Sequence, residues 1–400
     1  MRCPKTIANC QLQISNLRFT FCNSQFLLGV LTAALSVRFA RADEPEKPTL
    51  PLHAEVGTRE LLFSRDGKTL LSLATDSSQL WDMRTGKLLR KYEDFPPRRF
   101  GELPLVTPFE VSPDARLVAL GDIEGGDLRI KEVTSGKEIS RLKGRVSDEM
   151  MNVSMSFSPD GKLLALGGYP GNIHVWDTAT GKELHLLRWR NLGDGMGIGF
   201  SPDSKLLAAG SKDGQIGLWE VSSGKKMWSI KAYQEYQAVD QLIFSPDGKM
   251  LASDSANSTF RLWEVATGKK ALELPKDEYT FNIAFSPNSR LLASWAPDNI
   301  IRVRDLAGGK PRKLEGHSET IKCVVFSPDG KSLASAGRDQ TLRLWNVETG
   351  KERFRQKLAR EDIECIRFSP DGKILASVPG PNDRIQFWDP ASGKEIRPQN

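Results

Sequence analysis

Histidine, cysteine and acidic residues are the side chains with which proteins most often catalyse reactions or hold metals. The 400-residue chain has only four histidines, His53, His174, His185 and His317, and no two of them have a short metal-ligand spacing. The chain also lacks a Gly-x-Ser-x-Gly nucleophile elbow and a phosphate-binding loop. Aspartate and glutamate are plentiful but fall mostly at recurring turn positions. The sequence therefore predicts no catalytic residue, no metal site and no cofactor.

Two of the five cysteines, Cys323 and Cys365, lie in the repeated part of the chain, and the other three lie near its start. Each of the two comes shortly before a phenylalanine, Phe326 or Phe368, at the same position of two adjacent repeats. We interpret both as small buried hydrophobic residues. A disulfide needs Cα atoms roughly 4.4–6.8 Å apart, and equivalent positions of neighbouring repeat units are usually farther apart than that, so we expect no bridge.

Residues 1–42 have the pattern of a secretory signal peptide. They contain five basic residues and no acidic one, and an apolar run over residues 26–37 precedes Ala40-Arg41-Ala42. We expect cleavage before Asp43, an exposed tether over residues 43–51, and a periplasmic or extracellular location. The alternative is a retained membrane anchor, but twelve apolar residues are short for a hydrocarbon core about 30 Å thick.

The formal charge of +6 does not indicate a nucleic-acid-binding protein. Residues 43–400 hold 51 Lys or Arg and 50 Asp or Glu, so the excess of positive charge lies in the leader. A nearly neutral body lacks the basic surface by which most proteins bind nucleic acid. We therefore expect neither a nucleic-acid partner nor a membrane contact beyond the export signal.

One motif recurs along the rest of the chain: Phe-Ser-Pro-Asp-Gly-Lys, a short apolar run, a Trp-Asp or similar pair, and Thr-Gly-Lys. The interval between its Phe and Trp positions is nearly constant, and it is the same from Phe157 to Trp176 as from Phe326 to Trp345. The eight copies begin at Phe63, Val111, Phe157, Phe200, Phe244, Phe285, Phe326 and Phe368. Their spacing matches the period of about 40–45 residues that is typical of one four-stranded propeller blade.

Each part of the motif predicts a structural element. In Ser-Pro-Asp-Gly the proline presets the first corner of a turn and the glycine accepts the positive φ that follows. Short apolar or alternating runs, such as residues 291–294 and 342–345, read as strands. We therefore predict one all-β domain over residues 52–400, a single β-propeller of eight four-stranded blades, with seven blades as the alternative. Residues 50–56 are expected to supply or reinforce the outer strand of the last blade.

Three Trp-Asp pairs, at residues 81–82, 176–177 and 388–389, give the chain its family resemblance. The repeats resemble those of the WD-repeat β-propeller family. Repeat seven also resembles the family's hydrogen-bonded set, with His317, Ser335, Asp339 and Trp345 at the corresponding positions. The resemblance implies that this set ties the blade together. Repeats two and six depart from the pattern, with Lys131-Glu132 and Arg304-Asp305 in place of Trp-Asp.

The resemblance implies a protein-binding scaffold rather than an enzyme. Family members often bind partners on the upper face, which carries the links between blades and the turns between second and third strands. Aromatic residues and arginine are frequent binding anchors. Residues of these types that interrupt the repeat on this face are candidate partner-binding residues: Tyr169, Tyr236, Tyr279, Trp295 and Arg338.

Three other functions remain open. Glu220, Ser223, Gly224 and Trp228 resemble the tryptophan-docking motif of quinoprotein dehydrogenases, although repeat three has His185 at the tryptophan position. A propeller enzyme, either of that class or a hydrolase, and a propeller that binds carbohydrate or another cell-surface ligand are therefore alternatives. A ring of turn lysines on the lower face could bind an anionic surface, but we interpret those lysines as solvated.

Overall fold

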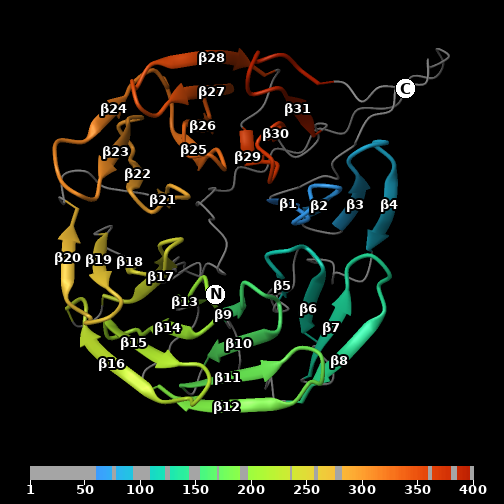
Figure 1. The fold of residues 1–400 in the computed structure, drawn as a ribbon, viewed down its shortest axis with the longest axis vertical. Coiled ribbons are helices and arrows are strands. Elements are labelled where there is room, and N and C mark those ends of the chain that lie inside the picture. Colours follow the sequence, from blue (N-terminus) through green and yellow to red (C-terminus); the bar gives the residue numbers. More distant parts are fainter. Residues whose placement is uncertain are drawn as a thin grey trace, which may run out of the picture.

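The structure is a computed structural model, and it describes residues 60–73, 78–92, 109–121, 127–143, 154–168, 171–189, 197–234, 237–255, 260–274, 282–358, 363–379 and 385–396. These residues form strands and turns, with no helix among them. The strands make eight antiparallel sheets arranged as blades around a central axis (Figure 1). The prediction of an all-β propeller with eight blades is confirmed, and the alternative of seven blades is excluded.

Within each blade the strands follow chain order from the centre of the ring to its rim, so the first is the inner strand and the last the outer strand (Figure 1). Blades one to four consist of β1 (Glu60–Phe63), β2 (Thr69–Leu73), β3 (Ser78–Asp82) and β4 (Leu88–Tyr92); β5 (Phe109–Val111), β6 (Leu117–Gly121), β7 (Leu128–Glu132) and β8 (Glu138–Leu142); β9 (Ser154–Phe157), β10 (Leu163–Gly168), β11 (Asn172–Asp177) and β12 (Glu183–Arg188); and β13 (Ile198–Phe200), β14 (Leu206–Gly210), β15 (Gln215–Glu220) and β16 (Lys226–Lys231). Blades five to eight consist of β17 (Val239–Phe244), β18 (Met250–Ser255), β19 (Arg261–Glu264) and β20 (Lys270–Glu273); β21 (Asn282–Phe285), β22 (Leu291–Trp295), β23 (Ile301–Asp305) and β24 (Arg312–Leu314); β25 (Ile321–Phe326), β26 (Ser332–Gly337), β27 (Thr341–Asn346) and β28 (Glu352–Lys357); and β29 (Ile363–Phe368), β30 (Leu375–Pro379) and β31 (Gln386–Trp388).

The Ser-Pro-Asp-Gly segment or a close variant of it joins the first two strands of each blade, and in blade four the segment reads Ser-Pro-Asp-Ser over residues 201–204. In blade four, Ser201 Oγ donates a hydrogen bond to Asp203 Oδ1 at 2.6 Å, and the Leu206 amide donates to Ser201 Oγ at 2.9 Å. The bond from Ser201 is the main reason that the pKa of Asp203 is lowered, because it stabilises the charged carboxylate. The aspartates of this motif therefore serve the turn.

The hydrophobic core is divided among the spaces between blades. Each of eight clusters of buried residues draws its members from two neighbouring blades. A single blade is too thin to bury both of its faces, so stacking of neighbours creates the core. One cluster joins Leu61 and Trp81 of blade one to Val378 and Phe387 of blade eight, which closes the ring (Figure 1).

Blade eight has three described strands, in the order β29-β30-β31. Its outer edge begins at a bridge between Trp388 and Glu395, and the Ile396 amide donates to the carbonyl of Phe387 at 2.7 Å. The C-terminal segment thus starts the outer strand of this blade. Residues 50–56, predicted to reinforce that strand, lie outside the described residues, as do the predicted signal peptide and the predicted tether.

Candidate interaction surfaces

The four predicted residues of blade seven form one hydrogen-bonded chain. The ring of His317 contacts Asp339 Oδ2 through Nδ1 at 2.8 Å and Ser335 Oγ through Nε2 at 2.7 Å. Trp345 Nε1 donates to the same Ser335 Oγ at 2.8 Å. His317 and Asp339 have side-chain exposures of only 0% and 2%, so solvent does not compete for these bonds. The set joins the loop before β25 to the β26–β27 hairpin.

Asp339 is held as a carboxylate inside this network. Burial favours the neutral acid, but hydrogen bonds from His317 and Thr341 outweigh it and lower the pKa of Asp339 from 3.8 to about 2. The guanidinium of Arg343 lies 3.6 Å from Asp339 and also contacts Glu352 at 2.7 Å. Every strong donor around Asp339 belongs to blade seven, so the group is committed to structure and not to chemistry.

Other blades replace the histidine with an aromatic residue, which the sequence analysis missed. In blade five Tyr233 takes its place: the hydroxyl of Tyr233 lies 2.9 Å from Ser253 Oγ, to which Trp263 Nε1 donates at 2.8 Å. In blade four Trp189 Nε1 donates to the carbonyl of Gly210 at 3.1 Å. Trp189 and Tyr233 precede the motif phenylalanines of their own repeats by the same interval. That shared spacing is the sequence signal that could have identified them.

Trp228 contacts the next blade, as a tryptophan of the docking motif of quinoprotein dehydrogenases would. Its Nε1 donates to the carbonyl of Val265 at 2.8 Å, and a Cβ added to Gly268 would lie 3.2 Å from its ring. Arg90 and Arg312 occupy the same outer-strand position in their own blades. They donate in the same way to the carbonyls of Thr134 and Val347, each in the next blade. Because side chains of several types make this contact, the docking joins neighbouring blades and is no sign of a quinone cofactor.

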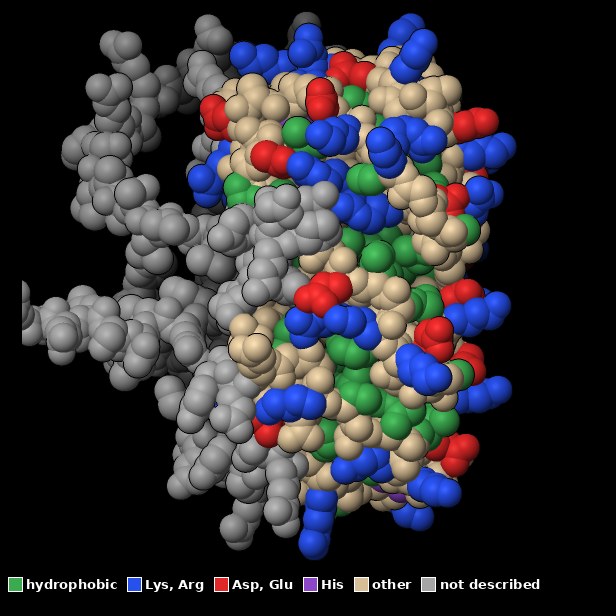
Figure 2. Space-filling model, turned by 90° about the vertical axis from the view of Figure 1, so that its left-hand side faces the viewer, with side chains coloured by type: hydrophobic (Ala, Val, Ile, Leu, Met, Phe, Trp, Pro, Cys, Tyr) green, Lys and Arg blue, Asp and Glu red, His purple; other side chains and the backbone are tan. Residues whose placement is uncertain are grey.

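The turn lysines of the lower face do not form a purely basic ring. This face carries the first-to-second and third-to-fourth strand turns. Lys205 Nζ lies 3.8 Å from Asp203 of its own turn, and Arg290 pairs at 2.8 Å with Asp305. Blue and red side chains accordingly stand side by side along the right-hand edge of Figure 2. The lysines and arginines of this face are therefore interleaved with carboxylates at distances where opposite charges offset each other.

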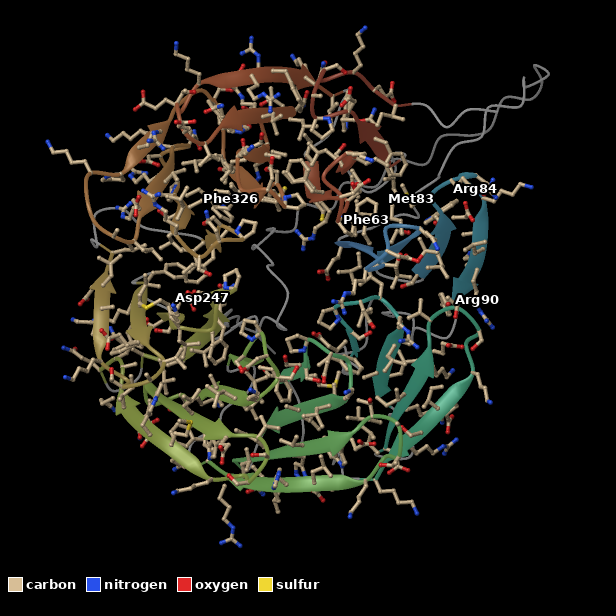
Figure 3. The ribbon with its side chains drawn as sticks, viewed as in Figure 1. Phe63, Met83, Arg84, Arg90, Asp247 and Phe326 are labelled. Atoms are coloured by element: carbon tan, nitrogen blue, oxygen red, sulfur yellow. The ribbon has the colours of Figure 1, made fainter. Side chains whose placement is uncertain are left out.

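The inner strands carry a largely buried ion pair at the seam of the ring, where blade eight meets blade one. Arg367 of β29 lies 3.5 Å from Glu60 of β1, which is 9% exposed. Burial and the nearby Glu60 raise the pKa of Glu110, on β5, well above its usual range. Phe63 and Phe326, labelled in Figure 3, mark the inner strands of blades one and seven, whereas Arg84 and Arg90 lie at the rim. The ion pair of Arg367 and Glu60 thus lies where the first and last blades meet.

The five predicted partner-binding residues differ in their exposure and in whether the structure describes them. Trp295 is 1% exposed and packs in the cluster between blades six and seven, so the prediction that it is an exposed anchor is wrong. Arg338 is exposed, in the turn between β26 and β27. Tyr169, Tyr236 and Tyr279 lie outside the described residues.

Three further features concern the described residues alone. No group of three or more His, Cys, Asp or Glu side chains among them could hold a metal ion. Cys323 and Cys365 are both unbridged thiols. Within those same residues, no helix is long and apolar enough to cross a membrane.

Comparison with known proteins assigns the repeats. The family model for the WD domain, G-beta repeat, matches residues 136–177, 308–346 and 354–389, and the model for the anaphase-promoting complex subunit 4 WD40 domain matches residues 198–280. Together they cover half of the chain. The chain belongs to the WD-repeat family. Most of blade six of this WD-repeat protein lies outside these matches, yet it has the same four-stranded fold, because the strand and turn positions persist where Trp-Asp is lost.

Individual relatives are more distant. A guanine nucleotide-binding protein subunit beta from Zea mays is 29% identical over 116 residues, which are 28% of this chain and 30% of the relative. The corresponding protein of Oryza sativa subsp. indica is 28% identical over the same length. The chain therefore matches under a third of the length of these relatives. The crystal structure of the computationally designed Ika8 protein superimposes with a TM-score of 0.64 at 23% identity, over 85% of this chain and 99% of that one. This last likeness concerns the fold alone.

Proposed function

We propose that this WD-repeat protein is an exported, non-enzymatic scaffold that binds a protein partner through its upper face. The observation that carries the proposal is the exposed Arg338, which interrupts the repeat on a turn fixed by two backbone bonds. The Arg338 amide donates to Thr320 at 2.9 Å, and the Gln340 amide donates to Gly337 at 3.2 Å. An exposed side chain on a fixed turn loses little backbone freedom on binding.

The described polar groups support binding over catalysis. Catalysis needs an acid, a base or a nucleophile that converge on one space. Here Asp339 is bonded within blade seven and Asp203 within its turn. The relatives from Zea mays and Oryza sativa are named as subunits, and a subunit functions in contact with other chains. These observations favour an interaction module.

The test is capture of partner from an extract of the compartment to which the protein is exported. Arg338→Ala and a triple alanine variant at Tyr169, Tyr236 and Tyr279 should each capture less partner while the melting temperature stays unchanged. Lys331→Ala is the matched control, because Lys331 is an exposed basic residue of the same blade on the lower face. Capture should survive in this control.

Two results would contradict the proposal. Undiminished capture by both upper-face variants would show that the partner binds elsewhere. Multiple turnovers of a substrate by the purified protein, lost in an upper-face variant, would make it a propeller enzyme. Export is tested separately, since protein retained in the cytoplasm with Met1 intact would remove that part of the proposal alone.

A further inference from the structure

Large exposed apolar side chains gather on one half of the rim. Among the described residues they have exposures of 41–52%, and all belong to the outer strands of blades one to four. The residues are Leu88 and Leu89 on β4, Ile139 on β8, Leu184 and Leu186 on β12, and Met227 on β16. These four strands follow one another along the rim in Figure 1. The described outer strands β20, β24 and β28 carry no such residue.

Strand β12, at the middle of this arc, presents an open edge. It pairs with β11 on one side and with no described strand on the other. The Trp189 amide donates to the carbonyl of Gly171, on the β11 side, at 2.9 Å. Backbone groups of alternate residues point in opposite directions, so those of Leu186 and Arg188 point away from the blade. Proteins usually protect such edges with charged residues, and here Leu184 and Leu186 stand exposed instead.

The charges beside these leucines define the complementary partner. Lys182 and Arg188 flank them and are exposed. The acid of the strand, Glu183, already contacts His174 Nδ1 at 2.7 Å. The four outer strands of the arc together hold six Lys or Arg and two Glu. A second copy of this basic rim would be repelled, whereas an acidic segment would be attracted.

We propose that β12 binds an extended segment of a partner protein in which apolar and acidic residues alternate, and that this segment adds to the blade as a fifth strand. The segment's backbone would bond to Leu186 and Arg188, its apolar side chains would cover Leu184 and Leu186, and its carboxylates would lie near Lys182 and Arg188. The inference goes beyond the proposed function, because it places a second binding surface on the rim and stands whether or not the upper face binds.

The experiment uses the full mature chain and a short fluorescent peptide of alternating glutamate and valine. The peptide should bind saturably below about 1 mM, weaken as salt is raised, and slow hydrogen exchange at the amides of Leu186 and Arg188. The double variant Leu184→Ser, Leu186→Ser removes both exposed leucines of β12 without changing the charge of the strand. It should weaken binding at least about tenfold, because it removes two apolar contacts with the peptide and leaves the charge of the strand unchanged.

A second variant and two controls keep the test decisive. Leu186→Pro removes an outward amide without breaking a bond to β11, so it should weaken binding at an unchanged melting temperature. Arg353→Ser with Arg355→Ser, on the matching strand of blade seven, should leave binding unchanged. A peptide with its glutamates and valines in two blocks should bind poorly. The proposal is overturned if the alternating peptide fails to bind or protects amides other than these. Loss in Leu184→Ser, Leu186→Ser of a concentration-dependent dimer or of binding to anionic vesicles, with peptide binding intact, would assign the arc to those occupants instead.

Discussion

Replacing His317 with alanine should destabilise blade seven without affecting partner capture. The imidazole contacts three side chains: Asp339 at 2.8 Å, Ser335 at 2.7 Å and Thr341 at 3.3 Å. Alanine removes all three contacts at once. Trp345 retains its bond to Ser335, so the damage falls mainly on Asp339.

The expected cost follows from the state of Asp339. Each pKa unit corresponds to about 1.4 kcal/mol. The fall of the Asp339 pKa from 3.8 to about 2 therefore places roughly 2–3 kcal/mol in its contacts, of which the hydrogen bond with His317 is the largest favourable one. Leaving a buried polar group without its partner costs about 1–3 kcal/mol. We expect His317→Ala to lower the free energy of unfolding by about 2 kcal/mol, or the melting temperature by about 3 °C for a domain of this size.

The pH dependence supplies a sharper assay. Because the pKa of Asp339 is lower in the folded protein, its contribution is complete above pH 4 and is lost as the pH falls through about 2. Urea unfolding followed by tryptophan fluorescence should show the full difference between parent and variant at pH 7. The difference should narrow between pH 4 and pH 2, as the carboxylate is protonated.

His174→Ala is the matched control for this prediction. His174 also contacts a carboxylate, that of Glu183 at 2.7 Å, but its side chain is 22% exposed and Glu183 is 40% exposed. Exposed pairs contribute about 0–1 kcal/mol, so this variant should unfold nearly as the parent does. Equal stabilities of His317→Ala and the parent at pH 7 would refute the conclusion that His317 stabilises the charged carboxylate of Asp339. A difference in stability that does not change with pH would refute it as well.

Three other predictions follow from burial, the seam and the leader. Trp295→Ala should cost roughly 3–5 kcal/mol in thermal unfolding, because it empties a packed site between two blades, yet leave capture intact; reduced capture at unchanged stability would restore it as a surface anchor. Arg367→Met leaves the buried Glu60 without its ion pair, so hydrogen exchange should speed up in β1 and β29 before other strands; uniform exchange would show that the seam is no weaker than other blade contacts. Protein recovered outside the cytoplasm should begin at Asp43 by N-terminal sequencing, and a start at Met1 would contradict the cleavage.

Local features of the fold could be predicted because each motif encodes one hairpin. The interval from Phe326 to Trp345 is fixed by two strands and a turn, so its recurrence counted the blades without any knowledge of their contacts. The set of His317, Ser335, Asp339 and Trp345 could be named from its resemblance to the WD-repeat family, because all four belong to a single repeat. Turn residues such as Asp203 were also readable, since their hydrogen bonds join near neighbours in the chain.

Contacts between blades could not be predicted in this way. Trp295 is buried by residues of the next blade, so its sequence position on an apparent surface turn was misleading. The exposure of Leu184 and Leu186 likewise depends on where the neighbouring outer strands lie.

The sequence by itself determined the number and internal form of the blades, because hairpins are specified by turn residues and by alternation over short stretches of chain. Only the tertiary structure decided how the blades close and which side chains remain exposed on the ring. Glu60 and Arg367, from opposite ends of the described chain, meet at the seam because eight blades complete one turn. Closure sums a small rotation over every blade, and no local pattern records that sum.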